Sequence, residues 1–164
     1  MAKVLVYNPG TNRMEVYYRS LSQRMPYAQH MTVKEFRSNS ASDVIWTDKR
    51  AMQAWNDLRS RFAKPIDIGF AFKKMSEGGH TGQSQHYAGV AFDLGQKMTS
   101  SQRDRLRNLA IASGKWGYVE PKALTPTWVG VNFGALLISI VYYFINLFIN
   151  SLYLSCIVRQ VSFK

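Results

Sequence analysis

The sequence predicts an α+β protein that ends in an apolar tail. Alternating apolar and polar residues on both sides of Asn8-Pro9-Gly10 predict a β-hairpin at the N-terminus. Two stretches, 48–62 and 100–113, repeat apolar residues at helical spacing and predict amphipathic helices. The chain has no charged residue from 123 to 158, which separates a tail from the charged part before it.

The predicted hairpin opens the first segment, residues 1–31. Pro9 and Gly10 suit the central positions of a type II turn, and residues 14–19 suit the return strand. The apolar run before the turn is too short for a signal peptide, so the sequence predicts none here. Residues 20–31 are expected to form a loop that leads into the main domain.

Residues 48–62 predict a helix that begins after a Thr47 cap. One face of this helix is apolar and is expected to pack into the core. The residues of that face are Met52, Trp55, Leu58 and Phe62.

Residues 100–113 predict a second helix, with Thr99 as its N-cap and Gly114 at its end. The arginines of this helix are expected to be solvated. Both predictions rest on local sequence alone.

Residues 84–93 carry the strongest functional signal, because they space a histidine and a carboxylate as two ligands of a catalytic zinc ion. His86 and Asp93 are seven residues apart and would point to opposite faces of one unbroken strand. Gly89 can break the strand, so that 90–93 forms a short strand of its own. Val90 and Phe92 would then face the core, while the small side chain between them leaves room beside a metal.

This segment resembles the pattern Ser-x-His-x-x-Gly-x-Ala-x-Asp of the zinc D-Ala-D-Ala carboxypeptidases and related bacterial and phage peptidoglycan endopeptidases. The resemblance extends over residues 33 to 132 and includes a helix opening at 32–36, a strand at 65–70, residues 117–120 and the segment around Trp128. It implies a small antiparallel sheet with flanking helices that holds zinc (Zn2+). The fixed positions of the pattern are Ser84, His86, Gly89, Ala91 and Asp93.

The resemblance breaks at the expected third zinc ligand. The family places a second histidine two residues after Trp128, where this chain has Gly130. A catalytic zinc ion typically has three protein ligands. The chain has three histidines and none of them follows His86. His80, in a glycine-rich loop, is a candidate substitute ligand, with an ordinary exposed loop histidine as the alternative.

The remaining site residues are also implied by the resemblance. Glu120 is the candidate general base, with a surface carboxylate as the alternative. Lys73, or the neighbouring Lys74, is a candidate to bind the substrate carboxylate as a point charge, with solvated lysines as the alternative. Ser84, the first fixed residue of the pattern, is a candidate substrate contact.

The net charge of +11 predicts anionic partners. The chain has neither an aromatic-basic RNA signature nor a convincing helix-turn-helix, so no nucleic acid is expected. With the motif, peptidoglycan stem peptides and anionic wall polymers are the expected partners. The one cysteine, Cys156, excludes an intrachain disulfide.

The tail, residues 133–164, has two interpretations. Its uncharged run 133–158 is long enough for a transmembrane helix. A tail anchor without a signal peptide would leave the domain in the cytoplasm, away from mature peptidoglycan. We therefore interpret the residues from about Gly130 onward as an ending read in a shifted frame, which the coding DNA can test.

The sequence thus predicts an incomplete zinc peptidase domain over residues 32–132. The expected function is zinc-dependent cleavage of cell-wall stem peptides, impaired by the lost ligand, with a cell-wall or extracytoplasmic location implied by the resemblance. One alternative is a non-catalytic wall-binding module. Another is a membrane-anchored accessory protein with a vestigial metal site.

Overall fold

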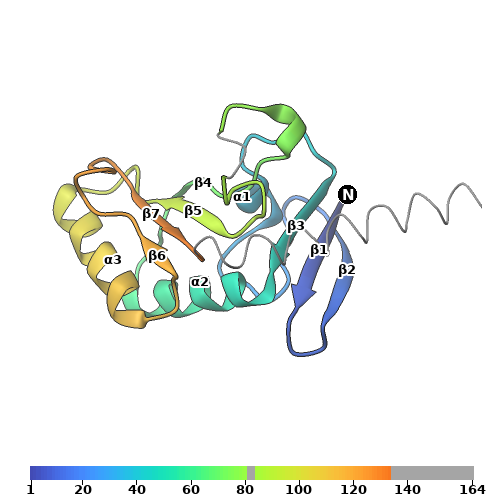
Figure 1. Ribbon diagram of the computed structural model, residues 1–164, viewed down its shortest axis with the longest axis horizontal. Coiled ribbons are helices and arrows are strands. Elements are labelled where there is room, and N and C mark those ends of the chain that lie inside the picture. The colour runs from blue at the N-terminus through green and yellow to red at the C-terminus, as the bar shows by residue number, and fades with distance from the viewer. Residues whose placement is uncertain (81–83, 134–164) are drawn as a thin grey trace, which may run out of the picture.

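The computed structural model is an α+β fold, as predicted, with two small sheets and flanking helices (Figure 1). It describes residues 1–80 and 84–133. The first sheet contains β1 (Ala2–Asn8), β2 (Arg13–Arg19) and β3 (Val44–Asp48). The second contains β4 (Ile68–Phe70), β5 (Ala91–Leu94), β6 (Tyr118–Val119) and β7 (Val129–Asn132). The helices are α1 (Val33–Arg37), α2 (Lys49–Phe62), the 3-10 turn η1 (Met75–Glu77) and α3 (Ser100–Ser113).

The first sheet has the order β2-β1-β3, with β1 and β2 antiparallel and β1 and β3 parallel. The predicted hairpin is therefore confirmed, but its turn is not of type II. Such a turn needs a positive φ at its third residue, and the positive φ of this connection belongs to Asn12 at 51° instead of Gly10. The Asn8 side chain accepts a hydrogen bond from the Gly10 amide at 3.1 Å, which stabilises a different local turn.

Helix α1 begins where the sequence predicts. Thr32 is its N-cap, and Thr32 and Glu35 form a reciprocal capping box. Val33 and Phe36 are its buried residues. This short helix thereby packs its apolar side into the core while its capped end stays at the surface.

Helix α2 has the predicted extent and apolar face, but its N-cap is Asp48 instead of Thr47. The Asp48 carboxylate accepts a hydrogen bond from the Arg50 amide at 2.7 Å. Thr47 is buried and donates through Oγ1 to the Gly89 carbonyl at 2.7 Å. Thr47 is an inner residue of β3, which continues through Asp48. Asp48 is therefore the residue at the junction of strand and helix, and it caps α2.

The second sheet is antiparallel throughout, in the order β4-β5-β7-β6. Strand β4 is shorter than the predicted strand 65–70. Strand β7, formed by the residues after Trp128, lies between β5 and β6. The residues that follow the break in resemblance therefore continue the sheet as far as Asn132.

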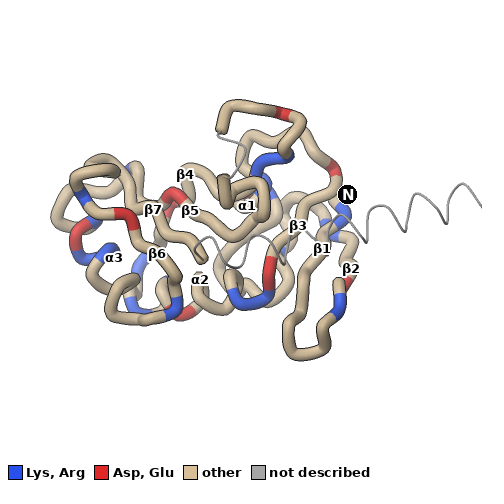
Figure 2. Tube along the Cα trace, viewed as in Figure 1, with Lys and Arg blue, Asp and Glu red and all other residues tan. Residues whose placement is uncertain are grey.

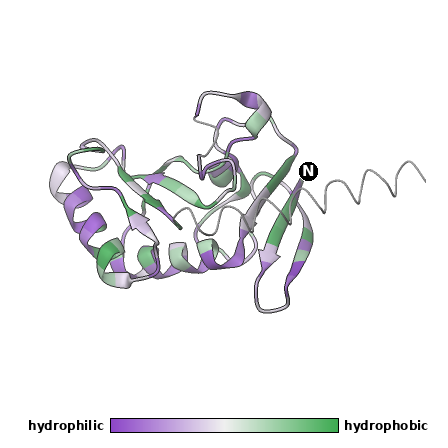
Figure 3. Ribbon diagram, viewed as in Figure 1, coloured by the Kyte–Doolittle hydropathy of each residue, from purple (hydrophilic) through white to green (hydrophobic). Residues whose placement is uncertain are grey.

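The core lies between the helices and the two sheets. Helices α2 and α3 contact each other and run along one side of the molecule (Figure 1). Figure 3 shows hydrophobic residues on β1, β3 and β5 and hydrophilic residues on the outer sides of the helices. Phe92 of β5 is fully buried and its ring stacks on Trp55 of α2 at 6.3 Å. The predicted apolar face of α2 is buried in full.

Helix α3 has the predicted Thr99 cap and Gly114 end. Figure 2 shows Lys and Arg on α3, at the start of α2 and on the N-terminal hairpin. No helix among residues 1–80 and 84–133 is long and apolar enough to cross a membrane. Residues 134–164, which carry the transmembrane interpretation and most of the shifted-frame interpretation, lie outside the described residues.

Candidate metal site at strands β5 and β7

The motif folds into consecutive turns that end at β5. The amides of Tyr87, Ala88 and Gly89 each donate to the carbonyl three residues earlier, at 3.1 Å. Gly89 has a φ of +68°, and a Cβ atom at this position would lie 1.9 Å from the Trp46 carbonyl oxygen. The break predicted at Gly89 is therefore confirmed, and the close approach to β3 requires glycine there.

His86 and Asp93 converge as the spacing predicts. Nε2 of His86 lies 3.6 Å from Oδ2 of Asp93. Nδ1 of His86 is 3.1 Å from the Ala71 carbonyl oxygen, which can only accept, so Nδ1 carries the proton and donates. This hydrogen bond orients the ring with Nε2 toward Asp93. Val90 and Phe92 are buried as predicted.

Burial governs the protonation of both side chains. It lowers the pKa of His86, while hydrogen bonds to the Ala71 and Ala91 carbonyls oppose this shift. Burial raises the pKa of Asp93 to about 6, against the opposing effects of His80 and of a hydrogen bond from the Trp128 side chain. At neutral pH the pair is therefore a neutral imidazole and a carboxylate, the two forms that bind metal ions.

The raised pKa of Asp93 predicts a stability change in the metal-free protein. Because the folded state holds this proton more tightly than the unfolded state, Asp93 destabilises the fold as pH rises from about 4 to about 6. We expect Asp93→Asn to raise the free energy of unfolding at pH 7 by about 1–3 kcal/mol. The gain should shrink toward pH 4, as measured by urea unfolding at both pH values. An equal gain at both values would contradict the assignment.

Gly130 lies directly opposite Asp93 in the β5·β7 pair. Side chains of directly opposed residues share one face of a sheet, so a side chain at 130 would project beside Asp93. The Glu120 carboxylate fills this space instead, since its Oε2 would lie 2.2 Å from a Cβ on Gly130. The Glu120 amide also donates to the Gly130 carbonyl at 2.8 Å. The structure thus places the predicted base beside His86 and Asp93.

Burial raises the pKa of Glu120, and the nearby Asp93 carboxylate raises it further, while Arg107 opposes the shift. Such a shift moves a carboxylate toward the neutral range, where a general base works best. Glu120 is half-buried, and its role as a general base stays a prediction.

His80 also lies at the site. Its ring centre is 5.1 Å from that of His86 and 5.0 Å from that of Phe70. Burial lowers the pKa of His80, as do His86 and Lys73, while Asp93 opposes them. His80 is exposed, as the alternative of a loop histidine expects, but its ring lies beside that of His86. Its role as a substitute ligand therefore stays a prediction.

Lys73 lies beside these rings. Its amide donates to the His86 carbonyl at 3.2 Å, and its Nζ is 6.0 Å from the centre of the Phe70 ring. Nζ also borders Gly79, since it would lie 2.9 Å from a Cβ there. Ser84 contributes its carbonyl to the first turn of the motif. Of the two candidate lysines, Lys73 is the one that the fold places near the histidines.

Three further residues shape the site without having been predicted to do so. Arg107 of α3 was expected to be solvated, but it is buried and donates to the carbonyls of Glu120, Thr125 and Trp128 at 2.8–3.0 Å. Phe70 packs against both imidazole rings. Tyr87 holds the backbone of His80. Arg107 is one of three arginines in this amphipathic helix, and the sequence does not show which of them is buried.

The donors that meet here suit zinc. Zinc bonds of about 2.0–2.2 Å that meet at a tetrahedral angle hold two donor atoms about 3.3–3.6 Å apart, and the His86–Asp93 distance is 3.6 Å. Within the described residues, however, no group of three histidine, cysteine, aspartate or glutamate side chains is already arranged to hold a metal ion. The structure therefore presents a two-donor site.

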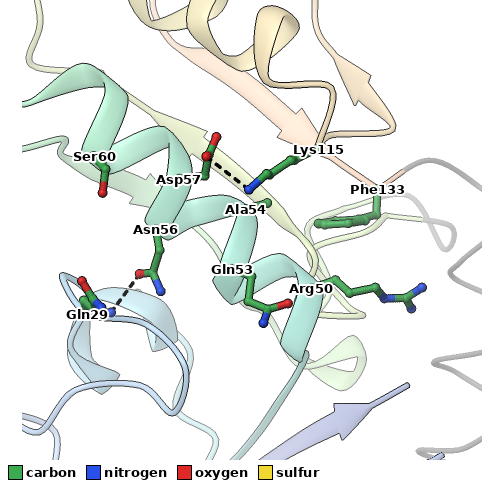
Figure 4. A pocket seen from close by; sticks show the side chains of 9 residues that line it. All are labelled: Gln29, Arg50, Gln53, Ala54, Asn56, Asp57, Ser60, Lys115 and Phe133. Atoms are coloured by element: carbon green, nitrogen blue, oxygen red, sulfur yellow. Dashed lines mark hydrogen bonds and ion pairs between the residues drawn. The ribbon is translucent and has the colours of Figure 1, made fainter. Parts of the chain in front are cut away.

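A pocket of about 730 Å3 lies along α2 (Figure 4). It contains none of the residues that the sequence predicts to bind metal or substrate. Lys115 and Asp57 form an ion pair of 3.2 Å across it. Its lining residues are Gln29, Arg50, Gln53, Ala54, Asn56, Asp57, Ser60, Lys115 and Phe133.

In comparisons with known proteins, the chain matches no family model, no curated protein and no solved structure. Its function is therefore argued from the residues and geometry above.

Proposed function

We propose that this protein is a zinc-dependent peptidase of the D-Ala-D-Ala carboxypeptidase type that acts on peptidoglycan stem peptides. The observation that carries the proposal is the pairing of a buried, oriented imidazole with a carboxylate at 3.6 Å, next to a second carboxylate with a raised pKa. His86 and Asp93 would hold the ion. The proposed location is the cell wall, where such peptides occur.

When bound, zinc would polarise the scissile carbonyl and acidify a water molecule. Glu120 would accept the proton that leaves the water as its oxygen adds to the carbonyl carbon. It would then return this proton to the departing amine as the C–N bond breaks. Arg107 supports this role by holding the carbonyls of Glu120 and Trp128, which fixes the chain that carries the base.

Lys73 would bind the terminal carboxylate of the stem peptide as a point charge. Ser84, which opens the motif turn, would contact the substrate from the same side. The net charge of +11 favours contact with anionic wall polymers. The lack of a side chain at Gly130 predicts that turnover is slow.

The test is the release of D-alanine from purified stem peptides by the full-length protein. We expect slow release that stops with a chelator and returns with zinc. Glu120→Gln should lower the rate by about 10²–10⁴-fold, as loss of a general base does, without abolishing zinc binding. His86→Ala should abolish both. Zinc binding with no detectable cleavage would contradict the peptidase proposal and favour a non-catalytic wall-binding module.

A further inference from the structure

We infer that His80 supplies the third protein ligand of the metal site, so that the ligand missing from β7 is replaced from the glycine-rich loop before the motif. This inference rests on the proposed zinc site. It assigns a ligand set of His80, His86 and Asp93, in which both imidazoles precede β5 in the chain.

The distance between the two rings fits a shared ion. Zinc–nitrogen bonds of about 2.0–2.1 Å at a tetrahedral angle place two imidazole centres about 5 Å apart. The centres of His80 and His86 are 5.1 Å apart, with their planes at 41°. The His80 ring would have to reorient to close the site, because the described residues contain no group of three donor side chains already arranged around a metal ion.

The backbone of His80 is already held at the site. The Tyr87 hydroxyl accepts a hydrogen bond from the His80 amide and donates one to its carbonyl, both at 3.2 Å. Tyr87 is itself buried and adjacent to His86. The segment that carries one imidazole is therefore fixed to the segment that carries the other.

Phe70 packs against both imidazole rings. Its ring lies 4.9 Å from His86 at a near-perpendicular angle and 5.0 Å from His80. Aromatic rings at such distances attract one another, so this contact keeps the two imidazoles near each other. Three separate contacts, from Tyr87, Phe70 and His86, thus place an exposed loop residue beside the donors.

Glu120 is the competing candidate, because its carboxylate lies over Gly130 and beside Asp93. A site closed by Glu120 would contain one imidazole and two carboxylates. That arrangement would also remove the carboxylate proposed as the base. The two candidates make different predictions for metal binding, so they can be separated directly.

The experiment is calorimetric titration of the full-length protein with zinc alone. We expect one zinc ion per chain. His80→Ala should weaken zinc affinity at least about tenfold, since even residues outside the ligand shell change affinity by this much. Glu120→Gln should change zinc affinity only slightly. His30→Ala is the matched control, because His30 is also an exposed histidine, and among residues 1–80 and 84–133 no ring contact joins it to His80, His86 or Phe70. Thermal unfolding of each variant without metal checks that the fold is kept.

A second measurement distinguishes ligation from a structural role. We expect His80→Cys loaded with cobalt(II) to show a thiolate-to-metal charge-transfer band, and His30→Cys to show none. Zinc affinity lost in His86→Ala but unchanged in His80→Ala would overturn this inference and leave the zinc peptidase proposal standing. Zinc affinity lost in Glu120→Gln would also overturn it, and would remove the carboxylate proposed as the base. Zinc that depends on His80 but supports no cleavage would reject the peptidase and keep the ligand. Failure to bind zinc would reject both.

Discussion

Replacing Gly89 by alanine is expected to destabilise the protein by more than about 4 kcal/mol, an effect in the exceptional range for a single substitution. Two causes combine. The φ of +68° disfavours any residue with a Cβ. The added Cβ would also lie 1.9 Å from the Trp46 carbonyl oxygen, a backbone atom that a side-chain rotation cannot move. Urea unfolding followed by far-UV circular dichroism measures the change.

Gly114→Ala is the matched control for this prediction. Gly114 has a similar φ of +62°, but nothing lies within 4 Å of the position that a Cβ would occupy. The cost there should be limited to the left-handed backbone, about 1–2 kcal/mol. Equal losses in the two variants would show that the contact between the motif turn and β3 does not require glycine.

The second large effect is expected from restoring a ligand on β7. In a protein that carries His80→Ala, adding Gly130→His and Asn132→Asp should strengthen zinc binding at least about tenfold and recover part of the peptidase activity. The new imidazole would project beside Asp93, because positions 93 and 130 are paired across the sheet. The Glu120 carboxylate must move aside, which the end of a flexible side chain can do. Recovery of activity should be incomplete, since a misplacement of about 1 Å can cost on the order of 100-fold in rate.

Gly130→Phe in the same background is the control. It displaces Glu120 in the same way but offers no donor atom to a metal ion. Zinc titration and D-alanine release should both remain at the level of His80→Ala alone. Tighter zinc binding in the phenylalanine variant would mean that moving Glu120, and not a new ligand, causes the change.

The local parts of this fold were predictable because their signals are contained in a few neighbouring residues. Thr32 and Thr99 are followed three residues later by Glu35 and Gln102, and both pairs form capping boxes. The break at Gly89 follows from the odd spacing of the two motif ligands. These elements depend on the backbone preferences of a few neighbouring residues, which can be read from the sequence.

The elements that were not predicted depend on contacts between distant segments. The cap of α2 shifts to Asp48 because Thr47 is engaged by Gly89, 42 residues later. The burial of Arg107 depends on carbonyls 13 to 21 residues away. No local pattern contains this information, because the partners become neighbours only after the two sheets have formed.

The candidate site also has a part that was predictable from local sequence and a part that was not. His86 and Asp93 were identified from their spacing, and the structure brings them together. The position of the Glu120 carboxylate over Gly130 depends on the pairing of β6 with β7, and the fixing of His80 depends on the Tyr87 hydroxyl. The sequence shows that position 130 has no side chain, but it cannot show that the Glu120 side chain fills the space there.

Gly130 of β7 lies at the candidate site without contributing a side chain to the core. The strand is joined to β5 and β6 by backbone pairing, and its buried side chains, Val129 and Val131, flank the glycine. The three atoms nearest to a Cβ at position 130 all belong to the Glu120 side chain and not to the core. Substitutions at this position can therefore change the donor set of the candidate site while the fold is kept.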